Sequence, residues 1–178
     1  MLGPFGKAVV AVAQVQETEH GIDVGGGTGS AARYAAGGVG RSGRVTGVDV
    51  NKSMMEIARS LPSVQGGPIQ WQVADSAALP LDNQSVDVVL CAQTLQFLGQ
   101  KQASLSEMRR VARSNGRISL SLWNEIETSP YFHVLVEAVT EHIGPETAVG
   151  LKSAFALSWA DEIRRWLQEA GFRQINMH

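Results

Sequence analysis

The sequence has few of the features that mark secreted, membrane-embedded or nucleic-acid-binding proteins. Its one cysteine, Cys91, excludes a disulfide framework and fits a reducing compartment, so we expect a cytoplasmic protein. No apolar run approaches the ~18 residues that a transmembrane helix needs. The 15 Lys and Arg residues against 17 Asp and Glu residues give a net charge of −2, which predicts no nucleic-acid or membrane partner. The four histidines show no ligand spacing, so no metal site is predicted.

What remains is the composition of one ordinary globular domain. The chain has 178 residues, of which 44% are hydrophobic and 18% charged, enough to bury a core without metal or disulfide support. The 19 glycines cluster at 21–29, 37–47 and 66–67, as expected for turns between elements. We therefore predict a single domain over residues 1–178, with a short N-terminal helix within 1–18, a core at 19–125 and a helical C-terminal segment at 126–178.

Short apolar, β-branched runs alternate with segments of helical spacing. Strands are predicted at 21–24, 44–50, 69–73, 86–91, 117–123 and, as a sixth, 172–177. Helices are predicted at 6–16, 30–36, 54–59, 101–113, 130–142 and 161–170. Such alternation requires parallel strands joined by crossover helices, so the predicted fold is a three-layer, Rossmann-like, doubly wound α/β sheet.

Ligands of such sheets bind outside the carboxyl ends of the strands, so the residues that follow each strand are the candidates for chemistry. Asp23 and the run Gly25, Gly26, Gly27, Thr28, Gly29 stand at the end of the first strand. Asp49 ends the second, 20 positions after Gly29. Candidates after the third and fourth strands are Ala74, Asp75, Ser76, Cys91, Ala92 and Gln93.

Two classes of cofactor bind at such an edge. Nicotinamide enzymes use the spacing G-x-G-x-x-G to hold a diphosphate. Gly25 and Gly27 fit that spacing, but the third position is Ser30. A carboxylate at Asp23, two residues before the first glycine, suits an ammonium group better than a diphosphate. S-adenosylmethionine, a sulfonium with an amino-acid tail, is therefore the favoured cofactor, and a nicotinamide-dependent oxidoreductase is the alternative.

Five stretches in the expected order carry a resemblance to a known family. They are residues 22–29, 43–51, 74–81, 85–89 and 107–111. The sequence resembles the class I S-adenosylmethionine-dependent methyltransferases, in the small-molecule branch with a methyltransferase type 11 domain that includes ubiquinone/menaquinone-biosynthesis enzymes. The resemblance is closest over residues 20–125. It implies methyl transfer from S-adenosylmethionine to a small-molecule acceptor, which leaves S-adenosylhomocysteine.

The resemblance also implies a role for each matched residue. Asp23 and the loop from Gly25 to Gly29 would hold the methionine moiety. Asp49, with Val50 beside it, would take the ribose hydroxyls, and Met54 would pack by the adenine. The adenine amino group would donate to Asp75, next to Ala74 and Ser76. Cys91, Ala92 and Gln93 would lie beside the sulfonium.

Structural explanations stand beside these roles. The glycine run could be only a tight turn, Asp49 a helix cap, Asp75 a turn residue and Cys91 a core residue. The acceptor-side candidates are the neutral amides Gln93 and Gln96, and His133 as a general base.

Two departures from the family bear on function. Only about 20 residues precede the first strand, and the C-terminal β-hairpin that carries strand seven of the family sheet is apparently lacking. Either the chain is a truncated form or another chain completes the sheet, and a homodimer is one hypothesis because an open sheet edge favours pairing. A methyltransferase-like module without its own catalysis is thus a further alternative. The motifs do not specify a carbon, oxygen or nitrogen acceptor.

Overall fold

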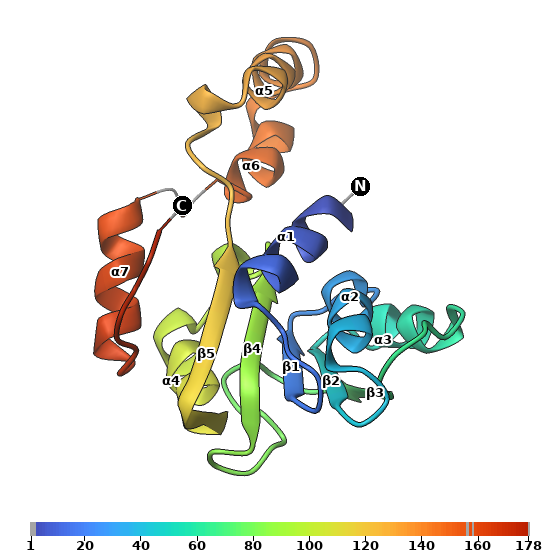
Figure 1. Cartoon of the computed structure of the whole chain (residues 1–178). Coiled ribbons are helices and arrows are strands. Elements are labelled where there is room, and N and C mark those ends of the chain that lie inside the picture. Colours follow the sequence, from blue (N-terminus) through green and yellow to red (C-terminus); the bar gives the residue numbers. More distant parts are fainter. Residues whose placement is uncertain (1–2, 156, 158, 178) are drawn as a thin grey trace.

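A parallel sheet with helices on both faces forms the body of the molecule (Figure 1). The computed structural model describes residues 3–155, 157 and 159–177. Within these ranges the sheet has five strands in the order β3-β2-β1-β4-β5, and all neighbours run parallel. The strands are β1 (His20–Val24), β2 (Arg44–Asp49), β3 (Ile69–Val73), β4 (Val86–Ala92) and β5 (Ala112–Ser121). The predicted doubly wound α/β fold is confirmed.

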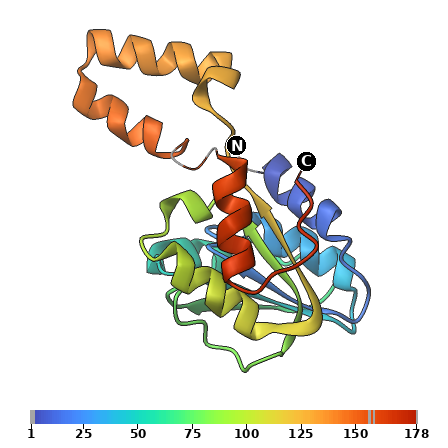
Figure 2. The same cartoon turned by 90° about the vertical axis from the view of Figure 1, so that its left-hand side faces the viewer.

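Helices and short 3-10 turns connect the strands. The helices are α1 (Gly3–Ala13), α2 (Ser30–Val39), α3 (Lys52–Ser60), α4 (Lys101–Val111), α5 (Pro130–His142), α6 (Pro145–Ser153) and α7 (Ala160–Glu169). The 3-10 turns are η1 (Leu95–Phe97) and η2 (Ile126–Thr128). Helices α5 and α6 pack against each other and project from the sheet body (Figures 1 and 2). None of these helices combines the length and apolar character that a membrane span requires.

The alternation of side chains along β4 builds a core on each face of the sheet. Val88 and Leu90 join one buried cluster with α1 and α2, which includes Val9 and Ala32. Val89 and Cys91 point the other way, into a cluster with α4 and α7. Burial of both faces explains why this strand reads as a continuous apolar run.

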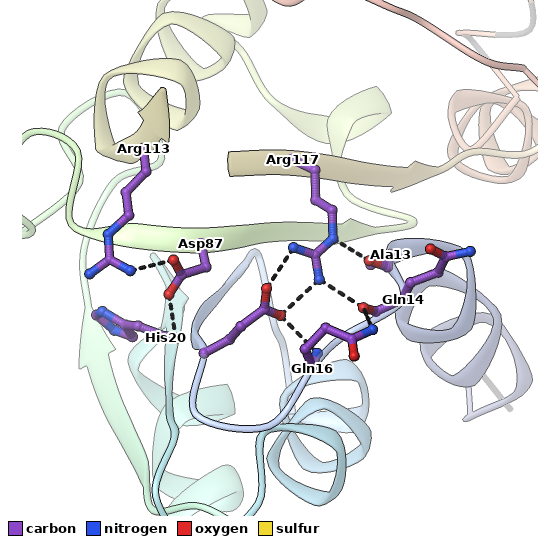
Figure 3. Close-up of polar contacts among 8 residues, drawn as sticks. Ala13, Gln14, Gln16, His20, Asp87, Arg113 and Arg117 are labelled. Atoms are coloured by element: carbon purple, nitrogen blue, oxygen red, sulfur yellow. Dashed lines mark hydrogen bonds and ion pairs between the residues drawn. The ribbon is translucent and has the colours of Figure 1, made fainter. Parts of the chain in front are cut away.

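A polar network ties the amino ends of the strands together (Figure 3). The Arg117 guanidinium donates to both carboxylate oxygens of Glu19, each at 2.7 Å, and to the carbonyls of Ala13 and Gln14 at the end of α1. Asp87 pairs with Arg113 and also accepts a 2.9 Å hydrogen bond from the backbone N–H of His20. This end of the sheet is therefore structural, and the opposite end is left for ligands.

Some sequence-based predictions are wrong in detail. The predicted sixth strand at 172–177 is irregular, because Gln174 has a φ of 54° and Phe172 and Ile175 both pack onto the core instead of alternating. β5 begins at Ala112, directly after α4, so the residues between the predicted helix at 101–113 and the predicted strand at 117–123 lie inside the strand, at a register shift. α6 was not predicted from the sequence.

Candidate active site

The loop between β1 and α2 is built from glycines in left-handed conformations. Gly25, Gly27 and Gly29 have φ values of 68°, 55° and 88°, which other residues adopt only with strain. A side chain at Gly25 would overlap the Thr94 methyl group, and one at Gly29 would overlap the Trp71 ring. At Gly27 the space is open, and a Cβ there would have no neighbouring atom within 4 Å. Packing therefore explains two of the glycines, whereas Gly27 leaves its backbone open to a ligand.

Asp49 joins this loop to the end of β2. Its Oδ2 accepts a 2.9 Å hydrogen bond from the Gly27 N–H, and its Oδ1 accepts one of 2.8 Å from the Asn51 N–H. The cap of α3 is a different residue, Asn51, whose side chain accepts from the Met54 N–H. Each carboxylate oxygen of Asp49 keeps a further lone pair for a ligand hydroxyl.

Asp23 is a buried carboxylate beneath the same loop. Asp23 is a residue of β1, and its Oδ2 accepts a 2.9 Å hydrogen bond from the Ala32 N–H in the first turn of α2. Oδ1 is buried and has no hydrogen-bond partner among the described residues. Burial, together with the charge of Asp49, raises the pKa of Asp23 to about 7, although the hydrogen bond from Ala32 acts to lower it. A cation beside Oδ1 would complete this site electrostatically.

An exposed apolar rim borders Asp49. Val50 is 72% exposed, Met54 40% and Val73 47%, although all three are hydrophobic. Val73 is the β3 partner of Asp49, and Met54 is in the first turn of α3. Exposed apolar side chains gathered at the carboxyl edge of a sheet are typical of a ligand surface.

The residues after β3 form a turn at the same edge. The Ala74 N–H donates to the Asp49 carbonyl at 3.1 Å. Asp75 is exposed, and its Oδ1 accepts from the Ala77 N–H, as a turn residue does. The Ser76 hydroxyl is 2.8 Å from that of Ser104. Ala74, Asp75 and Ser76 thus follow directly from a backbone hydrogen bond to Asp49, which places this turn near the Asp49 residue.

The carboxyl end of β4 lies next to the glycine loop, because β4 is the parallel neighbour of β1. Cys91 is fully buried, and burial, helped by the charge of Asp23, raises the pKa of its thiol to about 12. A thiol that stays protonated does not act as a nucleophile, so Cys91 is a packing residue here. Ala92 is half-buried, and Gln93 is buried with a left-handed φ of 55°.

His133 is on α5, away from these residues. It lines a groove of about 390 Å³ between η2, α5 and α6, and its Nε2 is 3.5 Å from Glu137. The lining of that groove includes none of the predicted cofactor residues. Among the residues that the structure describes, no cluster of His, Cys, Asp or Glu could hold a metal ion.

Three contacts of the site were not expected from the sequence. The Thr94 hydroxyl hydrogen bonds with the carbonyls of Gly25 and Ala92, at 3.0 and 3.1 Å. Trp71 of β3 lies against Gly29 and Gly47. A side chain at Gly6 in α1 would come within 2.8 Å of the Ser30 hydroxyl. The signals available were the glycines themselves, since each marks a close approach whose partner only the fold reveals.

Comparison with known proteins assigns the family. A family model described as a methyltransferase domain matches residues 22–120, more than half of the chain. The O-methyltransferase cnsE of Penicillium expansum is 28% identical over 165 residues, which cover 89% of this chain and 54% of that protein. The ubiquinone/menaquinone biosynthesis C-methyltransferase UbiE of Cupriavidus metallidurans is 30% identical over 179 residues, which cover 93% of this chain and 72% of that protein. The chain thus spans about half the length of the Penicillium relative.

A solved structure has the same fold. The crystal structure of a SAM dependent methyltransferase from Aquifex aeolicus aligns with a TM-score of 0.67 and 23% sequence identity, covering 97% of this chain and 82% of that one. The family match favours the methyltransferase prediction over the nicotinamide-dependent alternative. The chain belongs to the class I S-adenosylmethionine-dependent methyltransferases.

Proposed function

We propose that this chain binds S-adenosylmethionine at the carboxyl edge of β1, β2 and β4 and transfers its methyl group to a small-molecule acceptor. The observation that carries the proposal is the buried Oδ1 of Asp23, which has no partner in the described structure and lies under an open glycine loop. A buried carboxylate oxygen without a donor calls for a cationic or hydrogen-bonding ligand.

The residues present fit the groups of this cofactor. The open backbone at Gly27 receives the amino-acid tail, whose ammonium charge complements Asp23. The free lone pairs of Asp49 accept the two ribose hydroxyls. The exposed rim of Val50, Met54 and Val73 covers the adenine, and Asp75 is the candidate partner of its amino group. The sulfonium would then lie near Cys91, Ala92 and Gln93.

When bound, the cofactor supplies an already activated methyl group. The chain's own residues therefore have to orient the acceptor in line with the methyl carbon and sulfur and exclude water. Such positioning can contribute about 7–11 kcal/mol to the lowering of the barrier. The Asp23 carboxylate, whose pKa is raised, would face the ammonium group of the cofactor, and the described histidines lie away from this edge, at the amino end of β1 and on α5. This arrangement fits acceptors that need no early loss of a proton. The relatives named above act, by their names, on oxygen and on carbon, which supports a small molecule without defining the atom.

Calorimetric titration with S-adenosylmethionine and S-adenosylhomocysteine tests the cofactor site. We expect the wild type to bind both and Asp49→Ala to weaken binding by about 1–3 kcal/mol, because charge-assisted hydrogen bonds to the ribose are lost. Asp82→Ala is the matched control, since Asp82 is an exposed carboxylate in the loop before β4. Failure of a folded wild type to bind either compound, or equal affinity in Asp49→Ala, contradicts the proposal.

A further inference from the structure

The segment after β4 faces the glycine loop between β1 and β4. At this point the chain stops adding strands on one side of β1 and begins adding them on the other. β1 pairs with β2 on one side and with β4 on the other, so the crossovers diverge between β1 and β4. Crevices at such points bind ligands. The hydrogen bond from Thr94 to the Gly25 carbonyl holds the two loops together. The segment around Thr94 is therefore held close to the glycine loop.

Two side chains of this segment are buried amides in a hydrogen-bonded row. Gln93 is 6% and Gln96 5% exposed. Gln96 Nε2 donates to Gln93 Oε1, and Gln93 Nε2 donates to the Ser121 hydroxyl at the end of β5, each at 3.4 Å. The Gln93 backbone N–H also donates to the Ser121 carbonyl at 2.9 Å. The row therefore fixes the orientation of both amides from the ends of β4 and β5.

Holding the row in this form is unfavourable for folding. Gln93 has a φ of 55°, in the left-handed region that is strained for a residue with a Cβ. Strain of this kind in native proteins clusters at ligand sites.

The row ends in an acceptor without a donor. Gln96 Oε1 is buried, and no described group donates a hydrogen bond to it. Buried polar atoms are nearly always paired, and an unpaired buried carbonyl destabilises the folded state. Since the Gln96 amide N–H already donates to Gln93, the oxygen is the end left for a ligand.

We infer that Gln93 and Gln96 position the methyl acceptor, with Gln96 Oε1 accepting a hydrogen bond from an O–H or N–H group of that molecule. This inference rests on the proposed function and adds the chemistry of the acceptor to it. A neutral amide takes no proton, so the pair selects and orients a donor-bearing acceptor without acting as a base. Gln93 acts through Gln96 and is a positioning residue.

The test compares Gln96→Met, which keeps the side-chain length and removes the carbonyl, with Gln102→Met at an exposed position on α4. Thermal unfolding and calorimetry with S-adenosylmethionine come first. We expect Gln96→Met to melt close to the wild type, because the variant removes the unpaired oxygen of Gln96 but leaves Gln93 Oε1 without its donor, and to bind S-adenosylmethionine with unchanged affinity. A lower melting temperature together with weaker cofactor binding makes Gln96 a structural residue and overturns the inference.

Acceptor recognition is then measured in the presence of S-adenosylhomocysteine with two matched pairs of probes, catechol with 1,2-dimethoxybenzene and aniline with N,N-dimethylaniline. We expect the wild type and Gln102→Met to bind the donor-bearing member of at least one pair tenfold or more tightly, and Gln96→Met to bind both members alike. Equal binding within both pairs by the wild type, binding of no probe, or discrimination retained in Gln96→Met overturns the inference. Loss of the proposed function itself is seen separately, as failure of the wild type to bind S-adenosylmethionine.

Discussion

At the scale of one residue, Asp23 combines a stability cost with its proposed role in binding the cofactor. Its carboxylate is buried with one oxygen that no described residue pairs with, and its pKa is raised to about 7 from 3.8. Between those pH values the native state binds a proton that the unfolded state has released. The free energy of unfolding contributed by Asp23 is therefore present at low pH and is lost as the pH rises towards 7.

Asp23→Asn is accordingly expected to stabilise the ligand-free protein at pH 8 by roughly 1–3 kcal/mol, since the buried charge is removed. At pH 5 the gain is smaller, because the wild-type carboxyl is protonated there. Urea unfolding at both pH values measures the difference, with Asp82→Asn as the exposed control. S-adenosylmethionine affinity should fall in the same variant. A variant less stable than the wild type at pH 8 contradicts the expectation.

Gln93 allows the backbone strain to be measured apart from the side chain. In a left-handed position glycine is favoured, so Gln93→Gly should be more stable than Gln93→Ala by about 1 kcal/mol. At Ser106, an exposed position in the middle of α4, the same two substitutions should rank in the opposite order, with alanine more stable by about 1 kcal/mol. Denaturant unfolding of the four variants decides it. The same ranking at both positions would show that Gln93 is not strained.

At the scale of elements, α1 links the structural end of the sheet to the site. Arg117 hydrogen bonds with the last carbonyls of α1, and the Ser119 hydroxyl donates to the Val9 carbonyl. At the other end, Gly6 lies against the first turn of α2. Phe5 packs on Trp123, with ring centroids 5.0 Å apart. The helix thus braces the start of α2, where the glycine loop ends.

A methyl group at Gly6 tests this bracing. Gly6→Ala would bring its Cβ to 2.8 Å from the Ser30 hydroxyl and 3.0 Å from the Ala31 nitrogen, so α1 or α2 must shift. We expect a loss of about 1–3 kcal/mol in stability, with weaker S-adenosylmethionine binding. Gly3→Ala in the same helix, with open space around it, should change neither. Unfolding and calorimetry on both variants give the comparison, and an unaffected Gly6→Ala would mean that α1 does not contact α2 in solution.

The arm of α5 and α6 differs from the rest at the scale of the whole molecule. In the described part of these helices, Val136 and Ala148 are the buried residues, whereas every residue of β1 is buried. Few buried contacts mean a low free energy of local opening.

Backbone amides of residues 130–153 should therefore exchange with deuterium at least tenfold faster than those of β1 and β4. Exchange followed by mass spectrometry gives both rates in one sample, and α4, a helix with four buried residues, is the internal control. Equal protection of the arm and α4 would indicate that another surface covers the arm in solution.

The sequence predicts the body of this molecule better than its extremities, for physical reasons. β4 is buried on both faces, so its apolar run had one interpretation. Asp23, Asp49 and the glycines follow strands in the order that the fold requires, so they could be located in advance. Helix α6 has one buried residue, Ala148, so its sequence shows little of the apolar spacing that marks a helix. Residues 172–177 pack on the core through Phe172 and Ile175 and form no strand. The orphaned oxygens of Asp23 and Gln96 depend on long-range packing, which no local pattern carries.

The contact of Trp71 with Gly29 gives this protein an optical reporter of its own. The indole lies against the last residue of the glycine loop and under the Arg33 guanidinium, 5.6 Å from the ring centroid. Any ligand that moves the loop alters the surroundings of that indole and hence its emission. The other three tryptophans lie after β5 and in or beside α7, so Trp71→Phe separates their signal. Ligand binding at the loop can thus be followed by fluorescence without a label.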